Sequence, residues 1–126
     1  MAYTILIIED NEDNRELFVD ILAIRGYDVT TANNGQIGVE LARQQMPDLI
    51  LMDIQMPVMD GITAAGILKA DQATSRLKII ALTSFAMRGD EKKFLAAGFN
   101  GYLCKPIDTR ELPGLVKGWL QLETKS

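Results

Sequence analysis

Histidine is absent from this sequence, and cysteine occurs once. Without histidine, the chain lacks the most common general base, the most common metal ligand and the acceptor of a phosphohistidine relay. The single cysteine, Cys104, cannot form an internal disulfide, and its neighbours Tyr102 and Leu103 predict a buried, unreactive thiol. Chemistry in this chain therefore depends on carboxylates, hydroxyls and lysines.

An excess of positive charge and a long apolar run are also missing. Thirteen basic residues stand against 17 acidic residues, and the net charge of -4 offers no electrostatic footprint for nucleic acid or anionic lipid. The opening MAYTILIIED has neither the basic region nor the cleavage pattern of a signal peptide, and no apolar stretch approaches membrane-spanning length. We expect a cytoplasmic protein, monomeric or weakly dimeric, that binds neither nucleic acid nor a membrane directly.

What is present is an alternation of short apolar runs and segments with helical spacing. The runs are continuous and rich in aliphatic residues, which is typical of parallel strands buried on both faces. The expected strands are residues 3–8, 27–32, 48–52, 77–83 and 101–104. Their alternation with helices predicts an α/β fold, a five-stranded parallel sheet with helices on both faces. We expect residues 1–126 to form a single domain without an output domain, because residues 122–126 are too few to form one.

Helix boundaries and core-facing sides can also be read from the sequence. Gly26 and Gly98 are expected to end two helices, since glycine adopts the left-handed conformation at low cost. Asp108 with Glu111 predicts a capping box that opens the last helix, whereas Pro113, about one turn further on, predicts a late or frayed start. Apolar stripes with helical spacing predict core positions at Leu17, Phe18, Ile21, Leu22, Leu112, Leu115, Val116, Trp119 and Leu120.

Polar residues stand at the ends of four expected strands. Glu9 and Asp10 follow the first strand, Asp53 follows the third, Thr83 ends the fourth and Lys105 follows the fifth. In an open parallel α/β sheet these ends meet at one edge, where ligands bind. Each residue alone has an ordinary explanation, such as complementing a helix dipole. Their convergence on one edge predicts a functional cluster.

Three carboxylates in one cluster require positive charge nearby. Two like charges about 4 Å apart repel by on the order of 4 kcal/mol at an effective dielectric of about 20. Oxygen donors without histidine or thiolate suit a hard cation such as Mg²⁺. Mg²⁺ and Lys105 together would balance the three negative charges of Glu9, Asp10 and Asp53. A phosphoryl group could then enter at small electrostatic cost and form an acyl phosphate on an aspartate.

These motifs together resemble the receiver domain of bacterial two-component response regulators, which has the flavodoxin-like, CheY-like fold. The match consists of ED at 9 and 10, Asp53 within LILMDIQMPVMDG, Thr83 within IIALTSFA, Tyr102, and Lys105 within GYLCKPI. The motifs occur in the family's order over essentially the whole chain. The stretch SFAMRGDE is most similar to single-domain regulators of the DivK type. The resemblance implies the strand order 2-1-3-4-5.

The resemblance also implies how the acidic residues act. Asp53 would accept a phosphoryl group from a phosphohistidine on a sensor histidine kinase or histidine phosphotransfer protein. Mg²⁺ would be bound directly by Asp10 and Asp53, through water by Glu9, and by the backbone carbonyl of Gln55. The family has Asp more often than Glu at position 9, so the affinity or geometry of the metal site is expected to differ.

The remaining roles concern catalysis and switching. Lys105 would pair with the phosphoryl oxygens, and Thr83 would donate its hydroxyl to one of them. Tyr102 would then move inward and change the face that binds a downstream protein target. The family tunes autodephosphorylation at two positions, which here carry Gln55 and Phe85. The protein would thus be a switch that catalyses its own phosphorylation and slow dephosphorylation, not a turnover enzyme.

Three other functions fit parts of the sequence. A flavodoxin-like fold can bind FMN, but the loop after the first strand is the acidic EDNEDN, which repels phosphate. A Mg²⁺-dependent aspartyl phosphohydrolase usually carries a second aspartate two residues after its nucleophile, where this chain has Gln55. A docking module that is never phosphorylated is the third, although Asp53, Thr83 and Lys105 are all intact.

Overall fold

A computed structural model describes residues 2–84 and 90–121. Its strands are β1 (Thr4–Ile8), β2 (Asp28–Ala32), β3 (Leu49–Asp53), β4 (Ile79–Thr83) and β5 (Gly101–Cys104). Its helices are α1 (Glu12–Ala23), α2 (Gly35–Gln45), α3 (Gly61–Ala70), α4 (Asp90–Ala97) and α5 (Leu112–Gln121). All five expected strands are confirmed, and Asp53 is the last residue of β3 instead of the residue after it.

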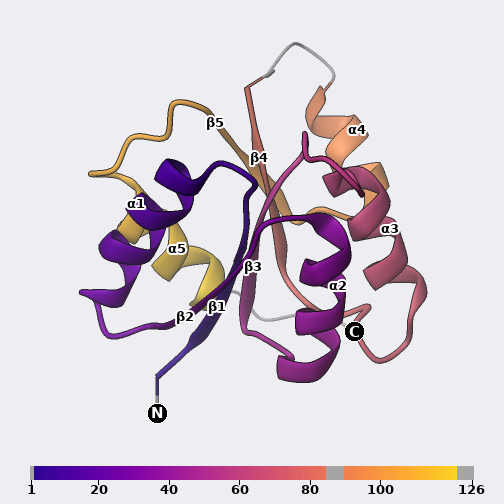
Figure 1. The fold of residues 1–126 in the computed structure, drawn as a ribbon, viewed down its shortest axis with the longest axis horizontal. Coiled ribbons are helices and arrows are strands. Elements are labelled where there is room, and N and C mark those ends of the chain that lie inside the picture. Colours follow the sequence, from indigo (N-terminus) through magenta and orange to yellow (C-terminus); the bar gives the residue numbers. More distant parts are fainter. Residues whose placement is uncertain (1, 85–89, 122–126) are drawn as a thin grey trace.

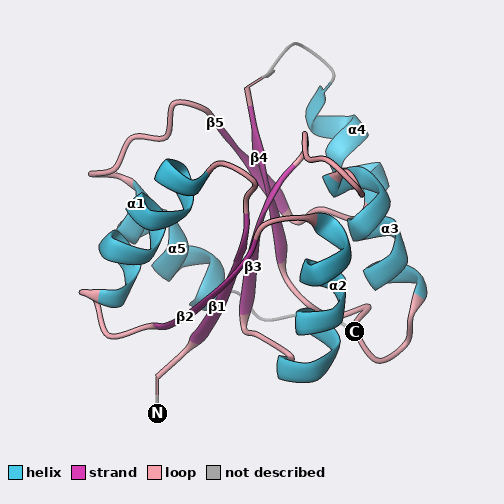
Figure 2. Cartoon of the chain, in the orientation of Figure 1, coloured by secondary structure: helices cyan, strands magenta, loops and turns pink. Residues whose placement is uncertain are grey.

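The strands form one parallel sheet in the order β2-β1-β3-β4-β5, which confirms the predicted fold class. The sheet lies between two helical layers (Figure 2). Helices α1 and α5 cover one face, and α2, α3 and α4 cover the other (Figure 1). The longest described helix, α1, has 12 residues, and none of the described helices combines the length and apolar character needed to cross a bilayer.

The core is divided by the sheet into two apolar clusters. Ile7 of β1 packs in one cluster with Phe18 of α1 and Val116 of α5. Its neighbour Ile8 points to the opposite face and packs in the other cluster, which includes Leu68 of α3. Successive strand residues alternate between faces, so a strand covered on both sides must be apolar at every position. This requirement explains the continuous apolar runs of the sequence.

Two residues of the predicted apolar stripes lie on the surface. Leu17 and Leu115 are 44% and 40% exposed, whereas their neighbours Phe18 and Val116 are buried. Each residue is rotated by about 100° around the helix axis from the one before it, so a residue next to a buried one can face the solvent. The buried side of the helix is therefore narrower than the stripe of apolar residues in the sequence. The prediction that Leu17 and Leu115 belong to the core is therefore wrong.

Both glycines predicted to end helices have positive φ, 89° at Gly26 and 106° at Gly98. After α4, Phe99 N–H donates to the carbonyl of Phe94 (3.0 Å) and Gly98 N–H donates to that of Leu95 (3.1 Å). These two hydrogen bonds form a Schellman motif, which supplies donors to carbonyls at the helix end that have no partner within the helix.

Helix α5 begins later than the capping pattern predicted. The Asp108 carboxylate accepts from Arg110 N–H (2.9 Å), and the Asp108 carbonyl accepts from the N–H groups of Glu111 and Leu112 (both 3.1 Å). Asp108 therefore caps a turn, and the helix starts at Leu112. Pro113 lies in the first helical turn, where its missing N–H breaks no helical bond. The prediction of a late start is confirmed, and that of a capping box at the helix start is wrong.

The prediction of a buried Cys104 is also wrong, because its side chain is exposed. Cys104 ends β5, an edge strand that pairs only with β4. An edge strand has a neighbour on one side only, so its last residue is covered less than its apolar sequence neighbours suggest.

Two glycine substitutions should have opposite effects on stability. Gly98→Ala should lower the free energy of unfolding by about 1–2 kcal/mol, because alanine is strained at positive φ. Its Cβ would also press against the Lys69 side chain. Gly66→Ala, at an exposed position inside α3 with open space around it, should raise the free energy by about 0.5–1 kcal/mol. Urea unfolding checks both, and equal signs would contradict the assignment of Gly98 as the helix terminator.

Candidate functional site

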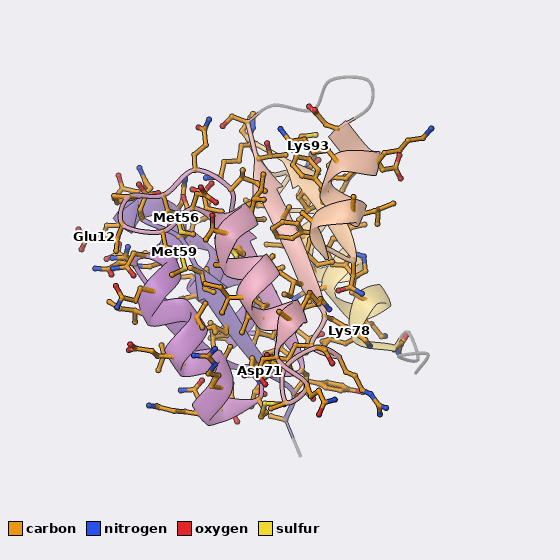
Figure 3. The ribbon with its side chains drawn as sticks, turned by 90° about the vertical axis from the view of Figure 1, so that its right-hand side faces the viewer. Glu12, Met56, Met59, Asp71, Lys78 and Lys93 are labelled. Carbon is orange, nitrogen blue, oxygen red and sulfur yellow. The ribbon has the colours of Figure 1, made fainter. Side chains whose placement is uncertain are left out.

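The carboxyl ends of the parallel strands lie at one edge of the sheet, at the top of Figure 1. The β3–α3 loop lies toward this edge, and Figure 3 shows its Met56 and Met59 above Lys78, which precedes β4, and Asp71, which follows α3. Segments that are distant in the sequence therefore meet here. Glu9 directly follows β1, and Lys105 directly follows β5.

Lys105 lies between two buried carboxylates. Its Nζ is 2.9 and 3.1 Å from the two carboxylate oxygens of Glu9, and 3.0 Å from Oδ2 of Asp53. Glu9 is 0% exposed and Asp53 is 5% exposed. Buried carboxylates are costly unless they are paired and hydrogen-bonded. One ammonium group thus compensates two buried negative charges that are contributed by different strands.

Asp10 completes an acidic cluster at the surface. Oxygens of Glu9, Asp10 and Asp53 lie within 4.8 Å of one another, and Asp10 is the exposed member. Asp10 also lines a cleft together with Gln55 of the β3–α3 loop. Oxygen donors that surround an accessible cleft match the ligand preference of Mg²⁺, which retains waters and needs few carboxylates. The donor set therefore fits a hard divalent cation.

The loop after β3 holds Asp53 in place. Its Oδ1 accepts a hydrogen bond from Gln55 N–H (3.1 Å). Gly61, the first residue of α3, returns to this loop, and its N–H donates to the carbonyl of Ile54 (2.9 Å). A Cβ at position 61 would overlap the Asp53 carbonyl oxygen, so glycine is required there for close approach. Asp60 caps α3 by accepting from Thr63 N–H (2.7 Å).

Burial and neighbouring charges shift two pKa values in this cluster. Burial, together with the hydrogen bond and charge of Glu9, raises the pKa of Asp53 against the opposing effect of Lys105. Burial tends to lower the pKa of Lys105, but Glu9 and Asp53 outweigh it, so this pKa is raised. Because the pKa of Lys105 is higher in the folded state than in the unfolded chain, its charge stabilises the fold fully at any pH below the ordinary lysine pKa. This stabilisation is lost only when the pH rises through the raised pKa. The Lys105 ammonium therefore keeps its charge at neutral pH.

Of the two expected switch residues, Thr83 ends β4 at this edge of the sheet, and Tyr102 pairs with Ala81 in the middle of β4. Thr83 is 3% exposed, and its carbonyl accepts from the N–H of Lys105 (2.7 Å). Tyr102 is half-buried on β5, and its ring centroid lies 5.7 Å from that of Phe94 on α4. Tyr102 thus connects β5 to α4. Phe85 lies outside the described residues.

Sequence reasoning missed two residues that contact the cluster from α1. Asn14 Nδ2 donates to Oε1 of Glu9 (3.0 Å). The Arg15 guanidinium donates to the carbonyls of Glu9 (3.0 Å) and Asp10 (3.3 Å). Asn14 and Arg15 lie in the first turn of α1, only a few residues after the acidic pair Glu9 and Asp10. This proximity in the sequence is the signal that could have indicated their contacts. Their polar side chains are otherwise typical of a solvent-exposed helix face.

Comparison with known proteins gives consistent matches over nearly the whole chain. The family described as the response regulator receiver domain matches residues 5–117. The chain is similar to the polar-differentiation response regulator DivK of Brucella anthropi, with 39% identity over 120 residues, which cover 95% of this chain and 98% of that protein. The DivK of Brucella ovis is 38% identical with the same coverage.

Solved structures agree. One similar structure is the receiver domain of sensor histidine kinase PA1611 from Pseudomonas aeruginosa, which has a magnesium ion coordinated in its active-site cleft. It matches with a TM-score of 0.87 and 38% identity, and the match covers 97% of this chain and 100% of that chain. A putative response regulator from Chloroflexus aurantiacus has a TM-score of 0.90 and 29% identity, with 97% and 100% coverage.

Removing the ammonium should expose the repulsion that it compensates. Lys105→Met leaves Glu9 and Asp53 buried without their cation, so the free energy of unfolding at pH 7 should fall by about 2–4 kcal/mol. Without Lys105 the pKa of the Asp53 carboxyl, which burial and Glu9 already raise, loses the opposing effect of the ammonium, so the loss should become smaller as the pH falls toward about 5. Urea unfolding without divalent ions at the two pH values measures this.

Matched variants keep this test specific. Lys117→Met, at an exposed position of α5, should change stability by less than about 0.5 kcal/mol. Adding Asp53→Asn to Lys105→Met should recover part of the loss, because one buried negative charge is then removed. A loss that neither depends on pH nor responds to Asp53→Asn would contradict the ion-pair account.

Proposed function

Because this chain belongs to the response regulator receiver domain family, we propose that Asp53 accepts a phosphoryl group from a phosphohistidine and that phosphorylation switches its protein-binding face. The observation that carries the proposal is the position of Lys105 Nζ, 3.0 Å from Oδ2 of Asp53 and beside a second carboxylate. A positive charge already stands where a phosphate on Asp53 would need it.

The proposed reaction is a transfer between phosphoramidate and acyl phosphate. A carboxylate oxygen of Asp53 attacks the phosphorus, the phosphorus–nitrogen bond breaks, and the imidazole leaves with the electron pair. Transfer of this kind requires in-line positioning and charge stabilisation more than covalent help from the protein. Gln55 N–H holds one oxygen of Asp53 and Lys105 holds the other, so the nucleophile is oriented before the donor arrives.

We propose Mg²⁺ as the cofactor, because the acidic cluster offers oxygen donors around an accessible cleft. Asp10 and Asp53 would hold the ion directly, Glu9 would act through water, and the backbone carbonyl of Gln55 would complete the protein's share. When bound, Mg²⁺ supplies positive charge for the phosphoryl oxygens. Mg²⁺ and Lys105 together balance the three carboxylates, so the site tolerates an added phosphate.

The proposed partners follow from this chemistry. A sensor histidine kinase or a histidine phosphotransfer protein supplies the phosphoryl group in the cytoplasm, and a protein target reads the phosphorylated state. The domain catalyses its own phosphorylation and slow hydrolysis of the acyl phosphate, without further substrate turnover. Supporting this assignment, a neutral glutamine stands two residues after Asp53, where an aspartyl phosphohydrolase usually has an acid.

The switch would act through Thr83 and Tyr102. Inverting a two-state equilibrium from about 1:99 to 99:1 takes roughly 5.5 kcal/mol, and one charge-assisted hydrogen bond from Thr83 supplies about 1.5–3 kcal/mol. Lys105 or other contacts must therefore contribute as well, or the switch is only partial. Tyr102 contacts Phe94 of α4, so its movement would change the face formed by α4, β5 and α5.

Intact-mass measurement tests the proposal. Wild-type protein incubated with Mg²⁺ and a small acyl-phosphate donor should gain a single phosphoryl group, on the Asp53 carboxylate that Gln55 N–H and Lys105 orient. Asp53→Asn, and wild type with a chelator in place of Mg²⁺, should gain none. Asp13→Asn, in the exposed first turn of α1, is the matched control and should behave as wild type.

The outcomes separate the competing functions. Rapid consumption of many donor equivalents per chain would indicate an aspartyl phosphohydrolase. Absence of any adduct in the folded wild-type protein would indicate a docking module without phosphorylation. Either result would overturn the proposed switch.

A further inference from the structure

The Glu9 carboxylate has a second donor besides Lys105, and this donor comes from α1. Asn14 Nδ2 lies 3.0 Å from Oε1 of Glu9, the same oxygen that Lys105 Nζ contacts at 2.9 Å. Asn14 and Lys105 also line one cavity of about 320 Å³ beside the site. Glu9 therefore lies in a continuous chain of contacts that runs from Asn14 through Glu9 and Lys105 to Asp53.

The backbone of Asn14 is held in place independently of this contact. Asn11 caps α1, and its side-chain oxygen accepts from Asn14 N–H (2.9 Å). In a capping box, the side chain at this third helical position reaches back to the cap residue. Here the Asn14 side chain reaches further back, to the residue that follows β1. The amide is thus presented to Glu9 from a fixed backbone position.

Glu9 itself has a fixed backbone and a side chain that requires orientation. Arg15 holds the Glu9 carbonyl (3.0 Å), and the Glu9 N–H donates to the carbonyl of Ala32 (3.0 Å). The glutamate side chain has one more rotatable bond than an aspartate, so fixing the backbone alone leaves its carboxylate free to turn. A neutral amide donor on one oxygen selects one orientation without competing for the positive charge.

We propose that Asn14 is a positioning residue, which holds the Glu9 carboxylate so that Glu9 in turn keeps the Lys105 ammonium beside Asp53. The inference deepens the proposed phosphoacceptor function and rests on it for its effect on rate. The Asn14 amide contacts Glu9, so Asn14 acts on Lys105 and Asp53 through Glu9. Its loss should release Lys105 from its place between the two carboxylates while leaving Asp10 and Asp53 available to a cation.

The first test measures Lys105 directly in protein without divalent ions. Brief acetylation followed by peptide mass spectrometry gives the labelling rate of Lys105 relative to Lys117, an exposed lysine in α5. Asn14→Leu should raise this ratio about three- to tenfold, the factor expected for loss of one hydrogen bond. Asn14→Ala, which removes the amide without adding charge, should raise it by a similar factor. Asp13→Leu, on the same helical turn, should leave it unchanged.

The second test separates positioning from a purely structural role. In Asn14→Leu, the maximal rate of adduct formation with the small acyl-phosphate donor should fall about three- to tenfold, while the Mg²⁺ dissociation constant changes by less than about twofold. Both effects of Asn14→Leu should disappear in a Glu9→Gln background, because the route through the carboxylate is already lost. Lower stability alone would produce neither pattern.

The two proposals can fail separately. If wild type forms no adduct, the phosphoacceptor function is wrong, and the labelling ratio still tests the positioning of Lys105. If Asn14→Leu and Asn14→Ala both label Lys105 at the wild-type ratio, or if the effect persists with Glu9→Gln, the positioning role of Asn14 is wrong. Should Asn14→Leu fail to fold, Asn14→Ala decides the question by the same criteria.

Discussion

One ammonium group between two buried carboxylates is the interaction on which the rest of this site depends. Lys105 contacts Glu9 and Asp53, which are 96 and 52 residues away in the chain. Their pairing joins the ends of β1, β3 and β5 at one edge of the sheet. Without the ammonium, the parallel arrangement would bring uncompensated negative charges together inside a low-dielectric environment, where they repel strongly.

The same arrangement connects the fold to function. A parallel sheet covered on both faces is apolar along its strands, so its polar chemistry is concentrated where the strands end. Lys105 neutralises part of the acidic cluster, and Asp10 remains exposed beside it. In the proposed function, this acidic cluster would hold a divalent cation and then accept a phosphate. Tyr102 of β5 contacts Phe94 of α4. Through this contact, phosphorylation of Asp53 would alter the proposed protein-binding face.

The sequence predicted the strands, the sheet and the residues at the sheet edge because continuous apolar runs and strand-end polar residues are both local patterns. It did not predict the contacts of Asn14 and Arg15 with the acidic pair, because these depend on how far a side chain reaches across the first turn of a helix. The apolar neighbours of Cys104 predict a core position because they do not reveal an edge strand. The capping pattern at Asp108 predicts a helix start because it does not distinguish a turn from the helix after it.

The position of a bound divalent ion is the most direct measurement of the central claim. Crystals grown with Mn²⁺ in place of Mg²⁺ would locate the ion by its anomalous scattering. We predict a peak between the carboxylates of Asp10 and Asp53, with the Lys105 ammonium still beside Asp53. A map of the folded protein with no peak among these carboxylates, at Mn²⁺ concentrations that saturate related receiver domains, would contradict the assignment of this cluster as the metal and phosphoacceptor site.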